Sequence, residues 1–439
     1  RTECYSTVRQ PSCINGDMRR GTNRPLKLLA FNADGIISQK YELCELIQSE
    51  KSDIILLNET HLKPHHRFNV PNFTTYRIDR LTQDGGGGTA ILVKSGIPHQ
   101  HFDLPPLISI EATAIQLQIG GKDTLIVSVY KQPRTALAVQ DITELTTLAD
   151  KVILAGDLNA KHANWNSYKN NQAGNILNTY ITRHNNLDIN APTEPTVRHK
   201  ANNNEDILDV VIYKNIIISP TITVINAMSS DHLPISFSIL ENSKTFDKQY
   251  KITNTNWEGY SRLLDQLIKP RLVADDPDIL DRAIENFSAS LRTAFSLNTT
   301  HQTAPYPIQL TPEINILLTR KKHLRQRFGI TRDPVTKTAL NWVTRTIKKK
   351  IKKLSNDNWQ DTINECNDNI MKLWRISRAL TNNPIENGAK IIHGSTGVQY
   401  EPDDQANTIA DTLELQFQPN TIADVDLEEE IQTFTDDYL

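Results

Sequence analysis

Long apolar runs are absent from this chain of 439 residues, and cysteine and methionine are scarce. No apolar stretch is long enough to span a bilayer, and none follows the basic N-terminus as the core of a secretory signal would. The cysteines form no C-x-x-C pair, which argues against structural zinc and a disulfide framework. We therefore expect no membrane partner and a reducing, intracellular environment. The chain begins with Arg1 rather than methionine, which indicates a fragment or an incomplete reading frame.

Two segments in the second half of the chain are each nearly free of one sign of charge: the first has almost no acidic residues and the second has no basic ones. The segment Arg320–Lys353 has thirteen Lys or Arg residues and one acidic residue, Asp333. The segment Glu401–Leu439 has twelve Asp or Glu residues and no Lys or Arg. The formal net charge of -3 hides this segregation, so the distribution of charge is more informative than its sum.

Strand and helix signals alternate in the first half of the chain. The runs Asp53–Asn58 and Val152–Ala155 are too short and too continuously apolar for anything but buried strands, whereas Glu111–Ile119 alternates like a half-buried strand. Strands in meanders with helices between them indicate an α/β layered sandwich rather than a doubly wound parallel sheet. Further strands are expected at 26–31, 74–78, 89–93, 124–130, 207–213 and 235–240, and helices at 38–49, 136–149 and 174–184.

The composition predicts five parts. Residues 1–25 are polar and without periodicity, as in a disordered leader. The layered domain is expected to span 26–241, followed by a weakly helical linker (242–312), a basic helical extension (313–400) and an acidic segment (401–439).

Polar residues recur at the ends of the predicted strands, where a layered sheet can bring distant segments together. Each has an ordinary explanation, because asparagines form turns, Glu59 can be a surface carboxylate and Asp231 can be a cap. Asp209 differs: apolar residues flank it on both sides, and a charge inside an apolar strand should be paired. We expect His232 to be its partner. The full set is Asn32, Asp34, Glu59, Tyr130, Asp157, Asn159, Asp209, Asp231 and His232.

Together these residue types provide what phosphodiester hydrolysis requires. Carboxylates without Cys or several His suit Mg²⁺, for which Mn²⁺ can substitute. A carboxylate–imidazole pair fixes the orientation of the His ring, as a general base requires. Amide and hydroxyl groups can donate hydrogen bonds to phosphate oxygens. The set therefore predicts a metal-dependent phosphodiesterase.

The motifs NADG, NET, VY, GDLN, LD and SDH follow one another in an order and at a spacing that resemble the endonuclease/exonuclease/phosphatase superfamily. Within it, the stretches GDLNAKHANWNS, GGGGTAILVKS and SSDHLPI resemble the apurinic-type endonucleases of jockey-like non-LTR retrotransposons. The resemblance covers about 26–240 and implies a four-layer α/β sandwich, with two packed mixed sheets flanked by helices. Downstream, RKKHLRQRFGITRDPVTKTALNWV, LWRISRAL and ADTLELQFQPN resemble the segment that leads toward a reverse transcriptase, whose own catalytic motifs are not found in this sequence.

The resemblance implies three roles at one site: metal binding, activation of water and contact with the scissile phosphate. The expected residues are Glu59, with Asp34 and Asp231, for the metal; Asp209 and His232, with Asp157 assisting the nucleophile or the leaving group; and Asn32, Asn159 and Tyr130 for the phosphate. Repair enzymes carry Asp at the Asp34 position, whereas retrotransposon endonucleases often carry a neutral residue there. Asp34 is therefore open between a ligand and a tolerated residue.

Two other segments are candidate nucleic-acid contacts. The polar segment 197–205 lacks Gly and Pro and precedes the strand of Asp209, and the equivalent loop of related endonucleases enters a groove near the nick. The basic helices can bind phosphates of element RNA or DNA without sequence preference. A solvated surface is the alternative for both segments. The candidate loop residues are Arg198, His199, Lys200, Asn202 and Asn203.

We therefore expect a Mg²⁺-dependent endonuclease, made in the cytoplasm and acting in the nucleus. It would nick target DNA and leave a 3′-hydroxyl for target-primed reverse transcription. A repair-type apurinic endonuclease or another phosphodiesterase of the superfamily is one alternative. A catalytically silent nucleic-acid-binding remnant is the other.

Overall fold

The computed structural model describes residues 22–80, 86–198, 205–246, 251–268, 277–303 and 310–364, with shorter parts of 373–417. Most of the predicted leader (1–25) and the end of the predicted acidic segment (401–439) lie outside these residues. None of the described helices combines the length and the apolarity that a membrane crossing requires.

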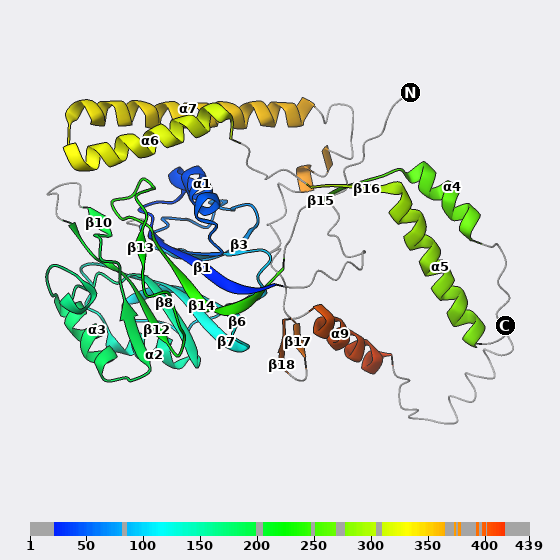
Figure 1. Ribbon diagram of the computed structural model, residues 1–439, viewed down its shortest axis with the longest axis horizontal. Helices are drawn as coiled ribbons and strands as arrows, with labels where there is room; N and C mark the ends of the chain where they lie inside the picture. The colour runs from blue at the N-terminus through cyan, green and yellow to red at the C-terminus, as the bar shows by residue number, and fades with distance from the viewer. Residues whose placement is uncertain are drawn as a thin grey trace.

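Two six-stranded mixed sheets form the layered domain (Figure 1). β1 is parallel to β2 and β7 is parallel to β8, while the other pairs are antiparallel. In spatial order, the first sheet holds β13 (Thr223–Val224), β14 (Ile235–Thr245), β1 (Thr22–Asn32), β2 (Ile54–Asn58), β4 (Thr89–Lys94) and β3 (Phe73–Ile78). The second holds β5 (His99–Phe102), β6 (Ile110–Ile119), β7 (Lys122–Lys131), β8 (Lys151–Asp157), β12 (Asp209–Lys214) and β9 (Leu187–Asn190).

Burial on both faces of the sheets explains the continuously apolar strands. In β2, Ile54 and Leu56 pack toward the second sheet, whereas Ile55 and Leu57 pack with α1 (Lys40–Glu50) on the outside. The outer face of the second sheet is covered in the same way by α2 (Val139–Thr147) and α3 (Gln172–Thr182). The predicted four-layer sandwich is therefore confirmed. Two short 3-10 helices, η1 (Ile37–Gln39) and η2 (Ala163–Trp165), complete the domain together with the paired strands β10 (Val197–Arg198) and β11 (Glu205–Asp206).

The structure departs from the sequence-based boundaries mainly at the edges of the sheets. β5, β9 and β13 were not expected, because short, partly exposed edge strands carry little apolar pattern. The first sheet also extends past the predicted limits of 26 and 241. β1 and β14 continue to pair there, with Thr22 opposite Thr245.

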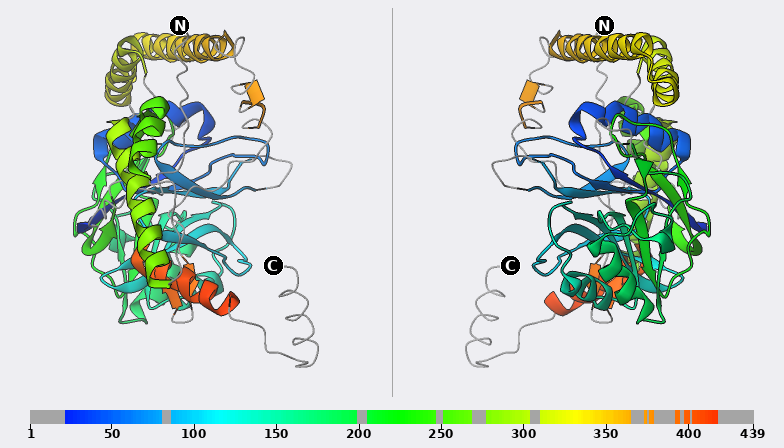
Figure 2. Two further views of the ribbon diagram at one scale, coloured as in Figure 1. Left: turned by 90° about the vertical axis from the view of Figure 1, so that its right-hand side faces the viewer. Right: turned by 90° about the vertical axis from the view of Figure 1, so that its left-hand side faces the viewer.

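The rest of the described chain is mostly helical (Figures 1 and 2). In the region expected to be a weakly helical linker, β15 (Lys251–Thr255) pairs with β16 (Thr299–Thr303), and α4 (Trp257–Leu267) and α5 (Pro277–Asn298) lie between them in sequence. Two long helices then pack side by side at the α1 end of the layered domain. These are α6 (Pro312–Thr331) and α7 (Pro334–Asn364); the short strands β17 (Ile392–Gly394) and β18 (Gly397–Gln399) and the helix α9 (Pro402–Gln416) follow.

Candidate active site

The predicted site residues meet where neighbouring strands end. Asn32 and Asn58 close the parallel strands β1 and β2 and are partners in register. In the second sheet, Asp157 at the end of β8 lies opposite Tyr130 of β7 on one side and Asp209 of β12 on the other. Because the two sheets pack face to face, both sets of strand ends come together at one rim. The expected convergence of these distant segments is confirmed.

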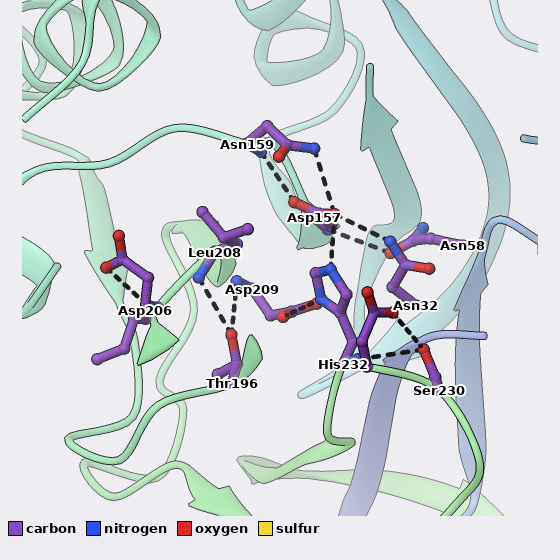
Figure 3. A network of polar contacts seen from close by, with 12 residues as sticks. Asn32, Asn58, Asp157, Asn159, Thr196, Asp206, Leu208, Asp209, Ser230 and His232 are labelled. Atoms are coloured by element: carbon purple, nitrogen blue, oxygen red, sulfur yellow. Dashed lines mark hydrogen bonds and ion pairs between the residues drawn. The ribbon is translucent and has the colours of Figure 1, made fainter. Parts of the chain in front are cut away.

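A buried ion pair joins Asp209 to His232, which lies in the loop before β14. The Nδ1 atom of His232 is 2.9 Å from Oδ2 of Asp209, and its Nε2 atom is 3.5 Å from Oδ2 of Asp157 (Figure 3). The ring therefore lies between two carboxylates that are 0% and 1% exposed as residues. The expected partnership of Asp209 and His232 is present. Among the described residues, the second oxygen of Asp209, Oδ1, has no hydrogen-bond partner.

The charges around His232 control its protonation. Burial of the ring is the largest single effect and lowers its pKa, but the negative charges of Asp209 and Asp157 outweigh burial and raise the pKa to about 10. Burial also raises the pKa of Asp157, to about 7, although the neighbouring His232 charge acts in the opposite direction. The charges of His232 and Asp157 act on each other's pKa, so these two side chains titrate together.

Asp157 is held in place by a network of amides (Figure 3). Asn32 donates to its carboxylate at 2.9 Å, as do the backbone N–H of Asn159 at 2.9 Å and the side chain of Asn159 at 3.3 Å. The backbone N–H of Asp157 donates to the side chain of Asn58 at 3.1 Å. Gly156 permits this close approach, because a Cβ there would lie 2.1 Å from the carbonyl oxygen of Val129.

A second group of ligand-type residues lies beside this network. A carboxylate oxygen of Asp34, a carboxylate oxygen of Glu59 and a ring nitrogen of His61 all lie within 4.8 Å of one another. All three residues have left-handed backbone conformations, with φ of 44°, 44° and 51°. Such conformations are uncommon outside glycine and concentrate at functional sites.

Glu59 stays ionised although it is partly buried. Burial is the largest single effect on its pKa and raises it, but hydrogen bonds from His61, Asn32 and Tyr130 lower the pKa to about 2. The same contact with Glu59 raises the pKa of His61. Burial and the Glu59 charge raise the pKa of Tyr130, which keeps its hydroxyl protonated and able to donate.

The donor set fits a divalent cation. The two carboxylates match the preference of Mg²⁺ for oxygen ligands, and an imidazole nitrogen is also compatible with Mn²⁺. Asp231, the other predicted ligand, is not one of the three residues in this group. Its charge acts instead on His232 and on Arg325 of α6.

The structure also brings in residues that the sequence did not single out. His61 follows Glu59 in the NETH motif, so its spacing was a usable signal. Arg80 gave no such signal, because only the tertiary structure places its guanidinium 5.8 Å from the ring centre of Tyr130 and pairs it with Glu111. Of the candidate DNA contacts, Arg198 belongs to β10; the others, His199, Lys200, Asn202 and Asn203, lie outside the described residues.

Comparisons with known proteins agree with the motifs. Residues 124–236 match the model of a family described as Endonuclease-reverse transcriptase. The chain is 26% identical over 425 residues to the probable RNA-directed DNA polymerase from transposon X-element of Drosophila melanogaster, covering 93% of this chain and 46% of that protein. It is 24% identical over 425 residues to the RNA-directed DNA polymerase from mobile element jockey of the same species, covering 94% of this chain and 46% of that protein.

Among solved structures, the endonuclease domain of TRAS1, a telomere-specific non-LTR retrotransposon, aligns with 49% of this chain and 98% of its own chain, at 20% identity and a TM-score of 0.41. The chain spans about half the length of the curated relatives it matches. As the motifs predicted, residues 124–236 match the Endonuclease-reverse transcriptase family model, and most of the chain is similar to the RNA-directed DNA polymerases of jockey and X-element.

Proposed function

We propose that the layered domain is a Mg²⁺-dependent endonuclease that nicks DNA and leaves a 3′-hydroxyl end. The observation that carries this proposal is the buried group of Asp209, His232 and Asp157 beside the ligand group of Asp34, Glu59 and His61. A binding module has no need of a histidine held between two buried carboxylates. Desolvating three titratable groups is costly unless their charges serve a purpose at that place.

The residues divide the work of hydrolysis among them. Asp34, Glu59 and His61 would hold the cation, which when bound neutralises charge on the phosphate oxygens. Asp209 orients the His232 ring through Nδ1, so that Nε2 faces the reacting atoms. The group of His232 and Asp157 accepts the proton of the attacking water, the water oxygen bonds to phosphorus, and the bond from phosphorus to the 3′ oxygen breaks. The departing oxygen takes up a proton and becomes the 3′-hydroxyl.

Amides and hydroxyls on the rim would bind the phosphate. Asn32, Asn159 and Tyr130 are candidates because each places a donor near Asp157 or Glu59. Their hydrogen bonds within the protein fix the donors before substrate arrives, and fixed donors contribute more to a transition state than donors that must reorient.

The kinship to mobile-element polymerases supports target-primed reverse transcription as the purpose of the nick, since that process needs a 3′-hydroxyl primer. It favours this role over a repair-type apurinic endonuclease. The two differ in substrate: a retrotransposon enzyme nicks intact duplex, whereas a repair enzyme requires an abasic site.

The test is a nicking assay of the full chain on supercoiled plasmid, with Mg²⁺ and with a chelator, beside an oligonucleotide duplex that carries one abasic site. The proposal predicts open-circle product from intact plasmid, lost with the chelator and regained with added Mg²⁺ or Mn²⁺. End-labelling of the nicked strand should reveal a 3′-hydroxyl. Cleavage of the abasic duplex alone would favour the repair enzyme, and no cleavage of either would favour the binding remnant.

We further propose that α7 binds nucleic acid, with element RNA as its natural partner. Lys348, Lys349, Lys352 and Lys353 are exposed on α7 and form two pairs at i, i+4 spacing. Trp342 and Trp359 of the same helix are 57% and 48% exposed. Clustered lysines bind phosphates, and exposed aromatic rings offer surfaces on which unpaired bases stack.

A further inference from the structure

Helix α6 contacts the layered domain at the loop that carries His232. Nη2 of Arg325 donates a hydrogen bond to the backbone carbonyl of Ser230 at 3.0 Å. One turn earlier on the same helix, the ammonium group of Lys321 pairs with Glu42 of α1. Figure 1 shows α6 lying beside α1 at this end of the domain. The helical extension therefore contacts the candidate active site through polar groups.

The same loop is also held from within the domain. Ser229 donates its backbone N–H to Oε1 of Gln39 at 2.7 Å and its hydroxyl to Oε2 of Glu42 at 2.9 Å. Glu42 therefore bridges Lys321 on α6 and Ser229 in the loop. The hydroxyl of Ser230 accepts from the backbone N–H of His232 at 3.1 Å. A continuous set of contacts thus runs from α6 to the backbone of His232.

We propose that α6 is a positioning element of the endonuclease, in which Arg325 and Lys321 fix the 229–232 loop and thereby the place of the His232 ring. This inference rests on the proposed function of the site. Ser230 is only 4% exposed, and a buried carbonyl deprived of a donor loses free energy unless the backbone moves. The ring of His232 must remain in line with Asp209 while facing Asp157, so a small shift of the loop disturbs two interactions at once.

The ion pair between Lys321 and Glu42 is not an ordinary surface pair. The two side chains are 9% and 16% exposed, so solvent screens their attraction little. Burial lowers the pKa of Arg325, while the charges of Glu42 and Asp231 raise it, and an arginine stays protonated in this environment. Two cations on α6 therefore face the acidic groups of the loop and of α1.

The experiment compares four variants of the full chain, of which three concern arginines and the fourth is Lys321→Met. Arg325→Met removes the donor and the charge, Arg325→Lys retains a charge and a donor, and Arg292→Met removes an exposed arginine from α5 as a control for charge. Plasmid nicking in Mg²⁺ gives kcat and KM separately. Hydrogen exchange followed by mass spectrometry reports the protection of the 229–233 amides without any need for activity.

We expect Arg325→Met to lower kcat on the order of 10-fold to 100-fold, as small displacements of catalytic groups do, with little change in KM. Exchange should become faster in 229–233 but not in β7 or β8. Arg325→Lys should restore most of the lost kcat, and Arg292→Met should match the wild type. Lys321→Met, which leaves the hydrogen bond to Ser230 in place, is a milder second variant and should shift both readings in the same direction.

Wild-type kcat in Arg325→Met, or wild-type exchange of its 229–233 amides, would overturn the inference. A third result would also overturn it: kcat stays low in Arg325→Lys and amide exchange becomes faster throughout the domain. That pattern would indicate general destabilisation. If the wild type itself does not nick, the proposed function fails, and the positioning role is then decided by the exchange alone.

Discussion

The layered domain and the helical extension differ in how they bury apolar side chains. In the domain, strands such as β2 are buried on both faces, with all five residues inside. In the extension, large side chains remain at the surface: Ile316 is 68% exposed, Ile330 84% and Trp342 57%. The hairpin of α6 and α7 has a single small apolar cluster around Ile314, Val343 and Ile347. Fixed catalytic geometry requires strands that are buried on both faces, whereas an adaptable binding surface is compatible with helices whose apolar side chains are exposed.

This contrast predicts that changes at the site remove activity without affecting the fold, and that changes on the extension alter binding without removing chemistry. The predictions below test this division, from the largest expected effect to the smallest.

Glu59→Gln should reduce nicking on the order of 10³-fold, because losing a carboxylate ligand removes several kcal/mol of charge stabilisation. The neutral amide keeps the size of the side chain, so thermal unfolding should be almost unchanged. Rates are measured on supercoiled plasmid at saturating Mg²⁺. The matched control is Glu144→Gln at an exposed position of α2, and wild-type nicking by Glu59→Gln would show that Glu59 is not a ligand.

His232→Ala should lower kcat by about 10²-fold to 10⁴-fold, the contribution of a positioned general base. Since Asp209 acts through His232, adding Asp209→Asn to His232→Ala should cost little more. A double-mutant cycle in single-turnover nicking measures this coupling. If the fold-losses in kcat of the two single variants instead multiply in the double variant, Asp209 and His232 do not act as a unit.

The rate of nicking should still rise with pH between 7 and 8. A base must be unprotonated to accept a proton, and the pKa values of His232 and Asp157 are raised to about 10 and about 7. An unperturbed histidine, with a pKa of about 6.5, would already be close to its plateau there. The measurement is kcat/KM from pH 6 to 9 at fixed Mg²⁺.

Asp209→Asn provides the control for this profile. It removes a negative charge that raises the pKa of His232, so the rising limb should move to lower pH. A wild-type profile that is flat above pH 7, or a limb that Asp209→Asn leaves in place, contradicts the electrostatic argument.

Replacing Lys348, Lys349, Lys352 and Lys353 by Gln should weaken binding of single-stranded RNA and DNA of any sequence. The slope of log affinity against log salt should become shallower by about 0.7 for each phosphate contact that is lost. Titrations at several salt concentrations give this slope, and kcat for nicking at saturating plasmid should stay at the wild-type value. An unchanged slope would show that the α7 lysines are solvated and do not bind phosphates. A large fall in kcat would show that the extension also contributes to the chemistry of the layered domain.

The success of the sequence-based predictions follows the strength of local patterns. The run Asp53–Asn58 predicted a buried strand, and β2 occupies Ile54–Asn58 with every residue buried. The charge of Asp209 within an apolar strand predicted a partner, and the structure supplies His232 at 2.9 Å. Edge strands such as β5 were missed because half-exposed positions have no apolar alternation to read. His61 was missed although it lies two residues after Glu59 in the NETH motif, because a single histidine there also fits an exposed surface position.

By itself, the sequence determined the layered architecture and the pairing of Asp209 with His232, because two-face burial of strands and a charge in apolar surroundings leave a local signature. It could not determine which basic residues of the extension contact the layered domain. The basic residues of α6 read as one uniform stretch, yet the tertiary structure directs Lys321 to Glu42 and Arg325 to the carbonyl of Ser230, while the lysines of α7 remain at the surface. The physical reason is that electrostatic and hydrogen-bonding energies depend on distance and burial, which arise only when segments separated by nearly three hundred residues pack together.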